Sequence, residues 1–474
     1  MRIAVLGAGY AGLTLARRLK RTLPAEHEIV VVNDSPAHLV QHEIHRAIRR
    51  PAIADDIVVP LTDVLERARI EVARVECVDP DAKTVTLANI PGSDRSARAY
   101  DGDDTEVEDT GIDRAGTDRT GGIDGIDGID ETSSTEIEIT SADDTGTGNA
   151  ASDDAGSTDT ASDDAESGST GTEGIGSDET ETEATESTLD YDICAVCLGA
   201  ETDFQDVPGI IEHATPLKRL PDAERIRADF LSLLPEGGRV VVCGAGLSGI
   251  QVAGELAALA REEGRREAVE IVLTEALDRV APAFSEEFGR AVRAELEEHN
   301  VRIRTNAPVE RATDEGIVVD GEDLPADQLI WTGGIRGPEA LDGERPVVKN
   351  TLQFGENTFV LGDAARVVDA SGEAVPASAQ SAVREARAVA ENIATIVDSE
   401  NAGGFRPRLS PFDFDSPGWL VSVGDGAVAR VGPTVLRGTP AKALKTTVGA
   451  GYLTSVGAIR NAVDLAREEL SGSN

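Results

Sequence analysis

The chain has 474 residues and a formal net charge of −43, from 87 acidic and 44 basic side chains. Nucleic acid is excluded as a partner, because phosphate binding needs basic patches. Four cysteines are too few for a disulfide framework. No apolar run is long enough to span a membrane, and Met1 leads directly into an apolar strand without a signal peptide. We therefore expect a cytoplasmic protein of two or three domains.

The acidic, lysine-poor composition is typical of proteins from a salt-accumulating cytoplasm, where dense screening removes the repulsion between like charges. A merely acidic protein with an acidic insert is the alternative.

The predicted elements begin with a strand, a glycine turn and a helix. Arg2–Leu6 is a short apolar run, residues 7–12 are GAGYAG, and apolar residues recur at helical spacing after them. In such a turn Gly7 permits the tight bend, Gly9 lets the backbone approach a pyrophosphate, and Gly12 lets the helix lie close to the strand. The N–H groups at the start of the helix favour phosphate. The N-terminus therefore predicts a dinucleotide site.

The second parallel strand follows, and at its end a dinucleotide fold places an acid on the adenosine ribose. Here Asn33 and Asp34 occupy that place. We expect Asn33 to hydrogen-bond a ribose hydroxyl, or Asp34 to substitute from one residue on. The next segment contains His38, His42 and His45. No cysteine or carboxylate set completes a metal shell at a known spacing, so we expect solvated or cofactor-flanking histidines and no metal site.

An acidic insert interrupts the first half of the chain. Residues 71–78 and 83–88 alternate like two paired strands. In residues 93–188 Asp, Glu, Gly, Ser and Thr dominate. Such a segment cannot bury enough apolar surface to offset its ordering entropy. We therefore predict that it is a disordered loop inserted at the tip of a hairpin.

Residues 189–200 predict a buried strand that ends in a glycine turn at Gly199. This segment contains Cys194 and Cys197, in the spacing of a redox pair. Residues three apart on an extended strand point to opposite faces and cannot easily form a disulfide. Two small core residues are therefore favoured over a redox pair.

A second strand, glycine turn and helix follow, with GAGLSG at residues 244–249. Gly244, Gly246 and Gly249 repeat the spacing of the first turn. Glu275 ends the next strand, where its carboxylate would hold both hydroxyls of an adenosine ribose and repel a 2′-phosphate, which favours NADH over NADPH. Two such turns imply two dinucleotides in one protein, a hydride donor and an acceptor.

Together these motifs resemble the two-dinucleotide-binding-domain flavoproteins, in three segments: GAGYAG at 7–12, GAGLSG at 244–249 and LGDA at 361–364. A narrower similarity to type II NADH:quinone dehydrogenases rests on HLVQ at 38–41, WTGGI at 331–335 and AQSA at 379–382. The resemblance covers nearly all of the chain outside residues 93–188.

The resemblance implies an α/β fold with two Rossmann-like domains, a small C-terminal α+β region and the long acidic insert. An FAD-binding domain is implied for residues 1–92, 189–225 and 329–400. An NAD-binding domain is implied for residues 226–328, and residues 401–474 form the C-terminal region.

The resemblance also implies FAD in the first turn and NADH, as the substrate, in the second. Asp363 would hold the ribityl chain of the flavin, and the helix that starts at Ala379-Gln380 would face the flavin ring and a quinone pocket. Gln251 and Gln380 are the implied catalytic residues. The implied cofactor-binding residues are Gly7, Gly9, Tyr10, Ala11, Gly12, Asn33, Asp34, His38, Gly199, Gly244, Gly246, Gly249, Glu275, Gly333, Gly362, Asp363, Ala379 and Gln380.

Three departures from the family pattern bear on function. Gln251 stands where the family has a glutamate near the nicotinamide, which affects NADH capture and proton delivery. Arg384 and Ala386 replace a glutamine and a glycine of the family's AQxAxQxG string, which weakens the prediction of quinone as acceptor. Asn33 replaces the acid on the adenosine ribose.

Several functions stay open at this point. The first is electron transfer from NADH to quinone; the second is a soluble NADH-dependent reductase of an iron–sulfur protein or another acceptor. A sulfide:quinone reductase needs a cysteine pair over the flavin, and Cys77 and Cys194 are candidates only if the fold brings them there. A flavoprotein that senses NADH is the non-enzymatic alternative.

The C-terminal stretch predicts hairpin strands at 419–431 and a helix over 441–470 with a modest apolar stripe. The stripe suits peripheral contact with the cytoplasmic face of a membrane. Packing on the protein body or on the second subunit of a homodimer explains it equally well.

Overall fold

The structure is a computed structural model that describes residues 1–90, 186–416 and 418–438, and then 440–442, 444–445, 452–454, 458 and 461–463. The loop predicted for residues 93–188 lies outside the described residues except at its end, where residues 186–188 begin a strand. Most of the helix predicted over 441–470 also lies outside them. No helix among the described residues is long and apolar enough to cross a membrane.

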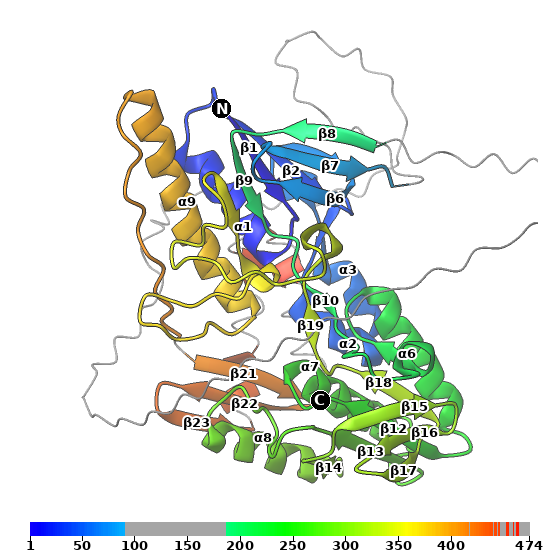
Figure 1. Cartoon of the computed structure of the whole chain (residues 1–474). Helices are drawn as coiled ribbons and strands as arrows, with labels where there is room; N and C mark the ends of the chain where they lie inside the picture. The colour runs from blue at the N-terminus through cyan, green and yellow to red at the C-terminus, as the bar shows by residue number, and fades with distance from the viewer. Residues whose placement is uncertain are drawn as a thin grey trace, which may run out of the picture. The chain divides into compact units, whose positions relative to one another are not determined.

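The first parallel sheet has β1 (Arg2–Leu6) at its centre, in the order β20-β9-β1-β2-β5 (Figure 1). Four of the five residues of β1 are buried, because a parallel strand between two layers of helices is covered on both faces. Helix α1 (Tyr10–Thr22) follows β1 and packs against α9 (Ala379–Asn401). The other strands are β2 (Glu28–Asn33), β5 (Arg69–Val72), β9 (Ile193–Val196) and β20 (Thr358–Val360).

The second parallel sheet repeats this plan around β12 (Gly238–Cys243), in the order β11-β18-β12-β13-β14. Helix α7 (Leu247–Glu262) follows β12 as α1 follows β1. The other strands are β11 (Ala214–Pro216), β13 (Val269–Thr274), β14 (Arg302–Arg304) and β18 (Gln328–Trp331). In both sheets the central strand pairs on one side with the next strand of the unit and on the other with a strand from much later in the chain, which creates the switch point where dinucleotides bind.

Smaller elements connect and flank the two sheets. The helices are α2 (Ile44–Arg49), α3 (Ala54–Ile57), α4 (Leu61–Val64), α5 (Ile210–His213), α6 (Leu220–Leu233), α8 (Glu286–Glu298) and the short 3₁₀ turns η1 (Gln41–Glu43), η2 (Pro51–Ile53), η3 (Glu339–Leu341) and η4 (Gly362–Ala364). Two antiparallel sheets have two strands each: β3 (Ala37–Leu39) with β4 (Val58–Pro60), and β10 (Glu201–Thr202) with β19 (Ile335–Arg336). Three more have three strands each, in chain order. They are β6 (Arg74–Asp79), β7 (Thr84–Ala88) and β8 (Glu186–Asp190); β15 (Val309–Thr313), β16 (Gly316–Val319) and β17 (Glu322–Pro325); and β21 (Gly418–Val423), β22 (Gly426–Val431) and β23 (Thr434–Arg437).

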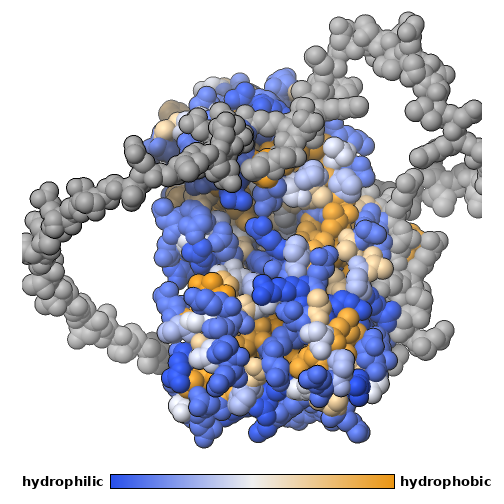
Figure 2. Space-filling view, turned by 90° about the vertical axis from the view of Figure 1, so that its right-hand side faces the viewer, coloured by the Kyte–Doolittle hydropathy of each residue, from blue (hydrophilic) through white to orange (hydrophobic). Residues whose placement is uncertain are grey.

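The two parallel sheets confirm the predicted pair of Rossmann-like domains, but some boundaries differ. The strand predicted at 189–200 is two strands, because β8 joins the antiparallel sheet while β9 joins the first parallel sheet. The strand predicted at 71–78 likewise divides between β5 and β6. The second parallel sheet already takes in β11, before the predicted boundary at residue 226. The face shown in Figure 2 is mostly hydrophilic with small apolar areas, as the composition suggests.

Candidate functional site: two dinucleotide cradles

The first glycine turn forms an open cradle at the N-terminus of α1. Gly7 has φ +94°, a conformation that side chains rarely adopt, and a Cβ at Gly12 would lie 1.8 Å from the Gly7 carbonyl oxygen. These two glycines are therefore required by the fold itself. At Gly9, the N-cap of α1, a Cβ would meet nothing within 4 Å. Open space in front of free helix N–H groups is what a pyrophosphate needs.

The second glycine turn reproduces this geometry in front of α7. Gly244 has φ +102°, and a Cβ at Gly249 would lie 1.9 Å from the Gly244 carbonyl oxygen. At Gly246, the N-cap of α7, a Cβ would again meet nothing within 4 Å. The chain therefore holds two equivalent cradles, and each leaves room at the middle glycine.

The strand-end residues Asn33 and Glu275 make the same contact with their turns. Asn33 Oδ1 accepts a 2.8 Å hydrogen bond from the N–H of Ala8, and Glu275 Oε2 accepts a 2.8 Å bond from the N–H of Ala245. The remaining oxygen of Glu275 accepts from the N–H of Leu277 at 3.0 Å. Each carboxylate oxygen has a second acceptor site, so this side chain can still bind a ribose hydroxyl.

Asn33 differs from Glu275 because its amide group also donates. Its Nδ2 donates to the carbonyls of Ser35 at 2.8 Å and Ala37 at 3.4 Å. Both amide hydrogens are therefore engaged within the protein, and an acid could not make these two bonds. The neighbouring Asp34 is about half exposed and lies 3.8 Å from the guanidinium of Arg219. Its carboxylate carries the negative charge at this strand end.

Aromatic and histidine side chains flank the first cradle. His38 is buried and donates from Nδ1 to the carbonyl of Ala8 at 2.8 Å, while its Nε2 lies 3.0 Å from the hydroxyl of Tyr452. Burial lowers the pKa of His38 to about 4, so the ring is neutral and Nε2 accepts. Tyr10 lies beside it, with its hydroxyl 2.5 Å from Nδ1 of His42. His38, which was predicted to be solvated or to flank the cofactor, is therefore buried and supports the backbone of the cradle at Ala8.

The third glycine turn of the first domain brings Asp363 to the same end of the sheet. Gly362 has φ +71°, and a Cβ there would lie 3.3 Å from Cβ of Ala11 in α1. The carboxylate of Asp363 has no hydrogen-bond or ion-pair partner among the described residues, although its backbone carbonyl accepts from Nε of Arg345 at 2.7 Å. An unpaired carboxylate beside an open cradle fits the hydroxyls of a ribityl chain. At Gly199, which has φ +73°, a Cβ would meet nothing within 4 Å, as at Gly9.

A buried carboxyl that the sequence analysis did not single out lies under this turn. Glu385 of α9 is 2% exposed, and its Oε2 accepts a 2.6 Å hydrogen bond from the N–H of Gly362. Burial raises the pKa of Glu385 to about 7, with the neighbouring Asp363 adding to the effect. Its helical position in the sequence is indistinguishable from that of a solvent-exposed glutamate, so no local signal identified it.

The predicted catalytic glutamines have different surroundings. Gln380 follows Ala379 at the start of α9; in the orientation that satisfies both neighbours, its amide donates to the carbonyl of Gly418 at 3.3 Å and accepts from Arg384 at 3.2 Å. Arg384, which replaces a family glutamine, is thus a direct partner of Gln380. Gln251 lies in α7 and donates from Nε2 to Oγ of Ser422, 3.4 Å away on the C-terminal hairpin.

The remaining predicted residues support the turns. Gly333 follows β18, and a Cβ there would lie 2.5 Å from the ring of Trp331. All four cysteines are free, and Cys194 and Cys197 are buried, which confirms the prediction of two small core residues. Burial raises the pKa of both thiols. Cys77 is exposed on β6, whereas Cys194 lies inside the parallel sheet, so the pair needed by a sulfide:quinone reductase is not formed.

Comparison with known proteins agrees with this geometry. The family model of the pyridine nucleotide-disulphide oxidoreductases matches residues 157–386. This segment of the chain is similar to that family. The resemblance to FAD-dependent flavoproteins with two dinucleotide-binding domains is thereby confirmed.

Individual relatives match almost the whole chain. A type II NADH:quinone oxidoreductase of Staphylococcus aureus is 22% identical over 97% of this chain and 96% of its own length. The NDH2 structure from Plasmodium falciparum in complex with NADH superposes with a TM-score of 0.68 at 12% identity, covering 98% of this chain and 97% of that one. The sulfide:quinone oxidoreductase of Aquifex aeolicus gives 0.65 at 16% identity, covering 97% and 92%. The structural likenesses establish the fold.

Proposed function

We propose that this chain is an FAD-dependent oxidoreductase that takes hydride from NADH and delivers two electrons to a quinone. The observation that carries the proposal is the pair of open glycine cradles in one chain, at Gly9 and Gly246. The full-length similarity to a type II NADH:quinone oxidoreductase favours quinone as the acceptor.

We assign the two cradles to different nucleotides from the residues that surround them. Asp363, whose carboxylate has no partner among the described residues, belongs to the first domain and suits the ribityl chain of FAD. Glu275 ends the second strand of the other domain, where a carboxylate excludes a 2′-phosphate and favours NADH. FAD supplies the redox chemistry, accepting hydride and releasing electrons. The protein binds and orients the two nucleotides and excludes water from them. No side-chain nucleophile is required.

The start of α9 and the net charge bear on the acceptor and on the location. Arg384 bonded to Gln380 makes the start of α9 more polar than a glutamine-rich motif would, which favours the alternative of a soluble reductase acting on an iron–sulfur protein. We place the protein in a salt-accumulating cytoplasm, supported by its net charge of −43. Peripheral contact with the membrane, or a homodimer, through the C-terminal region is part of the same proposal.

The test is an anaerobic titration of the FAD-loaded protein with NADH in high KCl, followed by a menaquinone analogue. NADH should bleach the yellow colour and the quinone should restore it. If NADH does not bleach the flavin, the proposal fails. If NADH bleaches it and only ferredoxin restores it, the iron–sulfur alternative is correct. If no acceptor restores it at a useful rate, the protein is an NADH sensor.

A further inference from the structure

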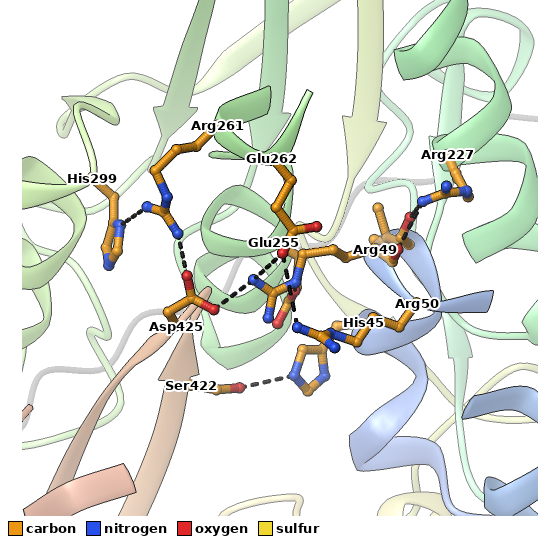
Figure 3. A network of polar contacts seen from close by, with 11 residues as sticks. His45, Arg49, Arg50, Arg227, Glu255, Arg261, Glu262, His299, Ser422 and Asp425 are labelled. Carbon is orange, nitrogen blue, oxygen red and sulfur yellow. Dashed lines mark hydrogen bonds and ion pairs between the residues drawn. The ribbon is translucent and has the colours of Figure 1, made fainter. Parts of the chain in front are cut away.

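A buried polar seam joins the helix behind the NADH cradle to the FAD-binding half of the chain. Figure 3 shows part of it: His45 and Arg49 of α2, Glu255 of α7, and Ser422 and Asp425 of the β21–β22 hairpin. His45 and Arg49 lie one turn apart on α2, and Gln251 and Glu255 lie one turn apart on α7. The hairpin contributes a residue to each of the two resulting layers.

The first layer is an ion cluster. Arg49 Nε lies 2.8 Å from Oε2 of Glu255, and Arg49 Nη1 lies 2.7 Å from Oδ1 of Asp425 in the hairpin turn. Glu255 is 1% exposed. Because a buried charge is costly without its partner, this layer fixes α7 against α2.

The other layer is neutral and ends at Gln251, near the start of α7 behind the second glycine turn. Oγ of Ser422 lies 2.8 Å from Nε2 of His45 and 3.4 Å from Nε2 of Gln251. Ser422 is 1% exposed and His45 is 3% exposed. Gln251 follows Gly249 of the second glycine turn by two residues, near the start of α7, and its side chain reaches Ser422 on the C-terminal hairpin.

The hydrogen-bond polarity of this layer follows from which groups can donate. The amide nitrogen of Gln251 only donates, so the acceptor left for the buried Ser422 hydroxyl, among the described residues, is Nε2 of His45. Burial lowers the pKa of His45 well below its usual value, so the ring is neutral and can accept there. The carbonyl oxygen of Gln251 has no partner among the described residues.

We infer that Ser422 and His45 are positioning residues that turn the carbonyl oxygen of Gln251 toward the nicotinamide, where it accepts a hydrogen bond from the carboxamide NH₂. This inference rests on the proposed function for the identity of the nucleotide.

The test compares NAD⁺ with its 3-acetylpyridine analogue, in which a methyl group replaces the carboxamide NH₂. Dissociation constants are measured by titration calorimetry on the FAD-loaded protein in high KCl. Ser422→Ala should weaken NAD⁺ binding about fivefold, the loss of one hydrogen bond, and leave the analogue unchanged. Ser422→Thr, which keeps the hydroxyl, should restore NAD⁺ binding to within about twofold.

A second variant and a control keep the result interpretable. His45→Leu removes the acceptor for Ser422, so the hydroxyl should donate to Gln251 and reverse its amide, again lowering the preference for NAD⁺ over the analogue. Asp425→Asn, in the ion layer of the same hairpin, should leave that preference unchanged.

Three results would overturn the inference. Equal weakening of both ligands by Ser422→Ala would mean that the amide NH₂, which can bond either carbonyl, faces the nucleotide. If Ser422→Ala leaves the binding of NAD⁺ and of the analogue unchanged, the layer does not position Gln251. The same conclusion follows if Ser422→Thr fails to restore the binding of NAD⁺. None of these measurements uses an electron acceptor, so the inference stands or falls separately from quinone reduction.

Discussion

Single residues at the strand ends decide how each cradle is held. Asn33 and Glu275 accept from equivalent backbone N–H groups, yet only Asn33 also donates to two carbonyls. Asn33→Asp should therefore release FAD rather than retain it, although an acid is usual on an adenosine ribose. The carboxylate would face the carbonyl oxygens of Ser35 and Ala37 at a cost of about 1–3 kcal/mol. The measurement is the FAD-to-protein ratio after dialysis, with Glu275→Gln as the matched control in the other cradle; equal or higher retention by Asn33→Asp would contradict the prediction.

Glu385 couples the stability of the first domain to pH. Its pKa is raised to about 7 in the folded protein, so between about pH 4.5 and pH 7 the folded state binds more protons than the unfolded state. Its contribution to stability therefore declines as the pH rises through this window, by on the order of 3 kcal/mol in total. Glu385→Gln keeps an acceptor for the N–H of Gly362 and should remove this slope. Urea unfolding of both proteins at pH 5 and pH 8 measures it; parallel pH dependences would contradict the assignment.

At the scale of elements, α2, α7 and the β21–β22 hairpin are joined by charges that cannot be separated cheaply. Burial raises the pKa of Glu255, opposed by the guanidinium of Arg49. Arg49→Met should destabilise the protein by about 3–5 kcal/mol, since Glu255 then remains buried and unpaired. The double variant Arg49→Met/Glu255→Leu should recover most of that loss. Denaturant unfolding in a double-mutant cycle measures the free energy of unfolding of the single and double variants. If the losses of the two single variants simply add up in the double variant, the two side chains are not coupled.

At the scale of the whole molecule, the acidic insert is placed where the fold needs only a turn. Ala88 of β7 and Glu186 of β8 are register partners in an antiparallel pair, so the strands on either side of residues 91–185 already meet. Replacing residues 91–185 with a short glycine-rich turn should leave the flavin content unchanged. The same deletion removes many acids and should lower the KCl concentration needed for stability. Loss of bound FAD in the deletion variant would show that the insert contributes to the cradle.

The sequence alone determined the two cradles, because each consists of a strand, a glycine turn and a helix within 25 consecutive residues or fewer, and the glycine spacing is required by local backbone geometry. It also determined that Cys194 and Cys197 are core residues, from the alternation of a single strand. Tertiary structure alone decided what orients the site: Ser422 meets His45 across 377 residues of sequence, and Gln251 across 171. A hydroxyl on a C-terminal hairpin carries no local pattern that distinguishes it from a surface serine, because its role is set by the side chains that folding brings beside it.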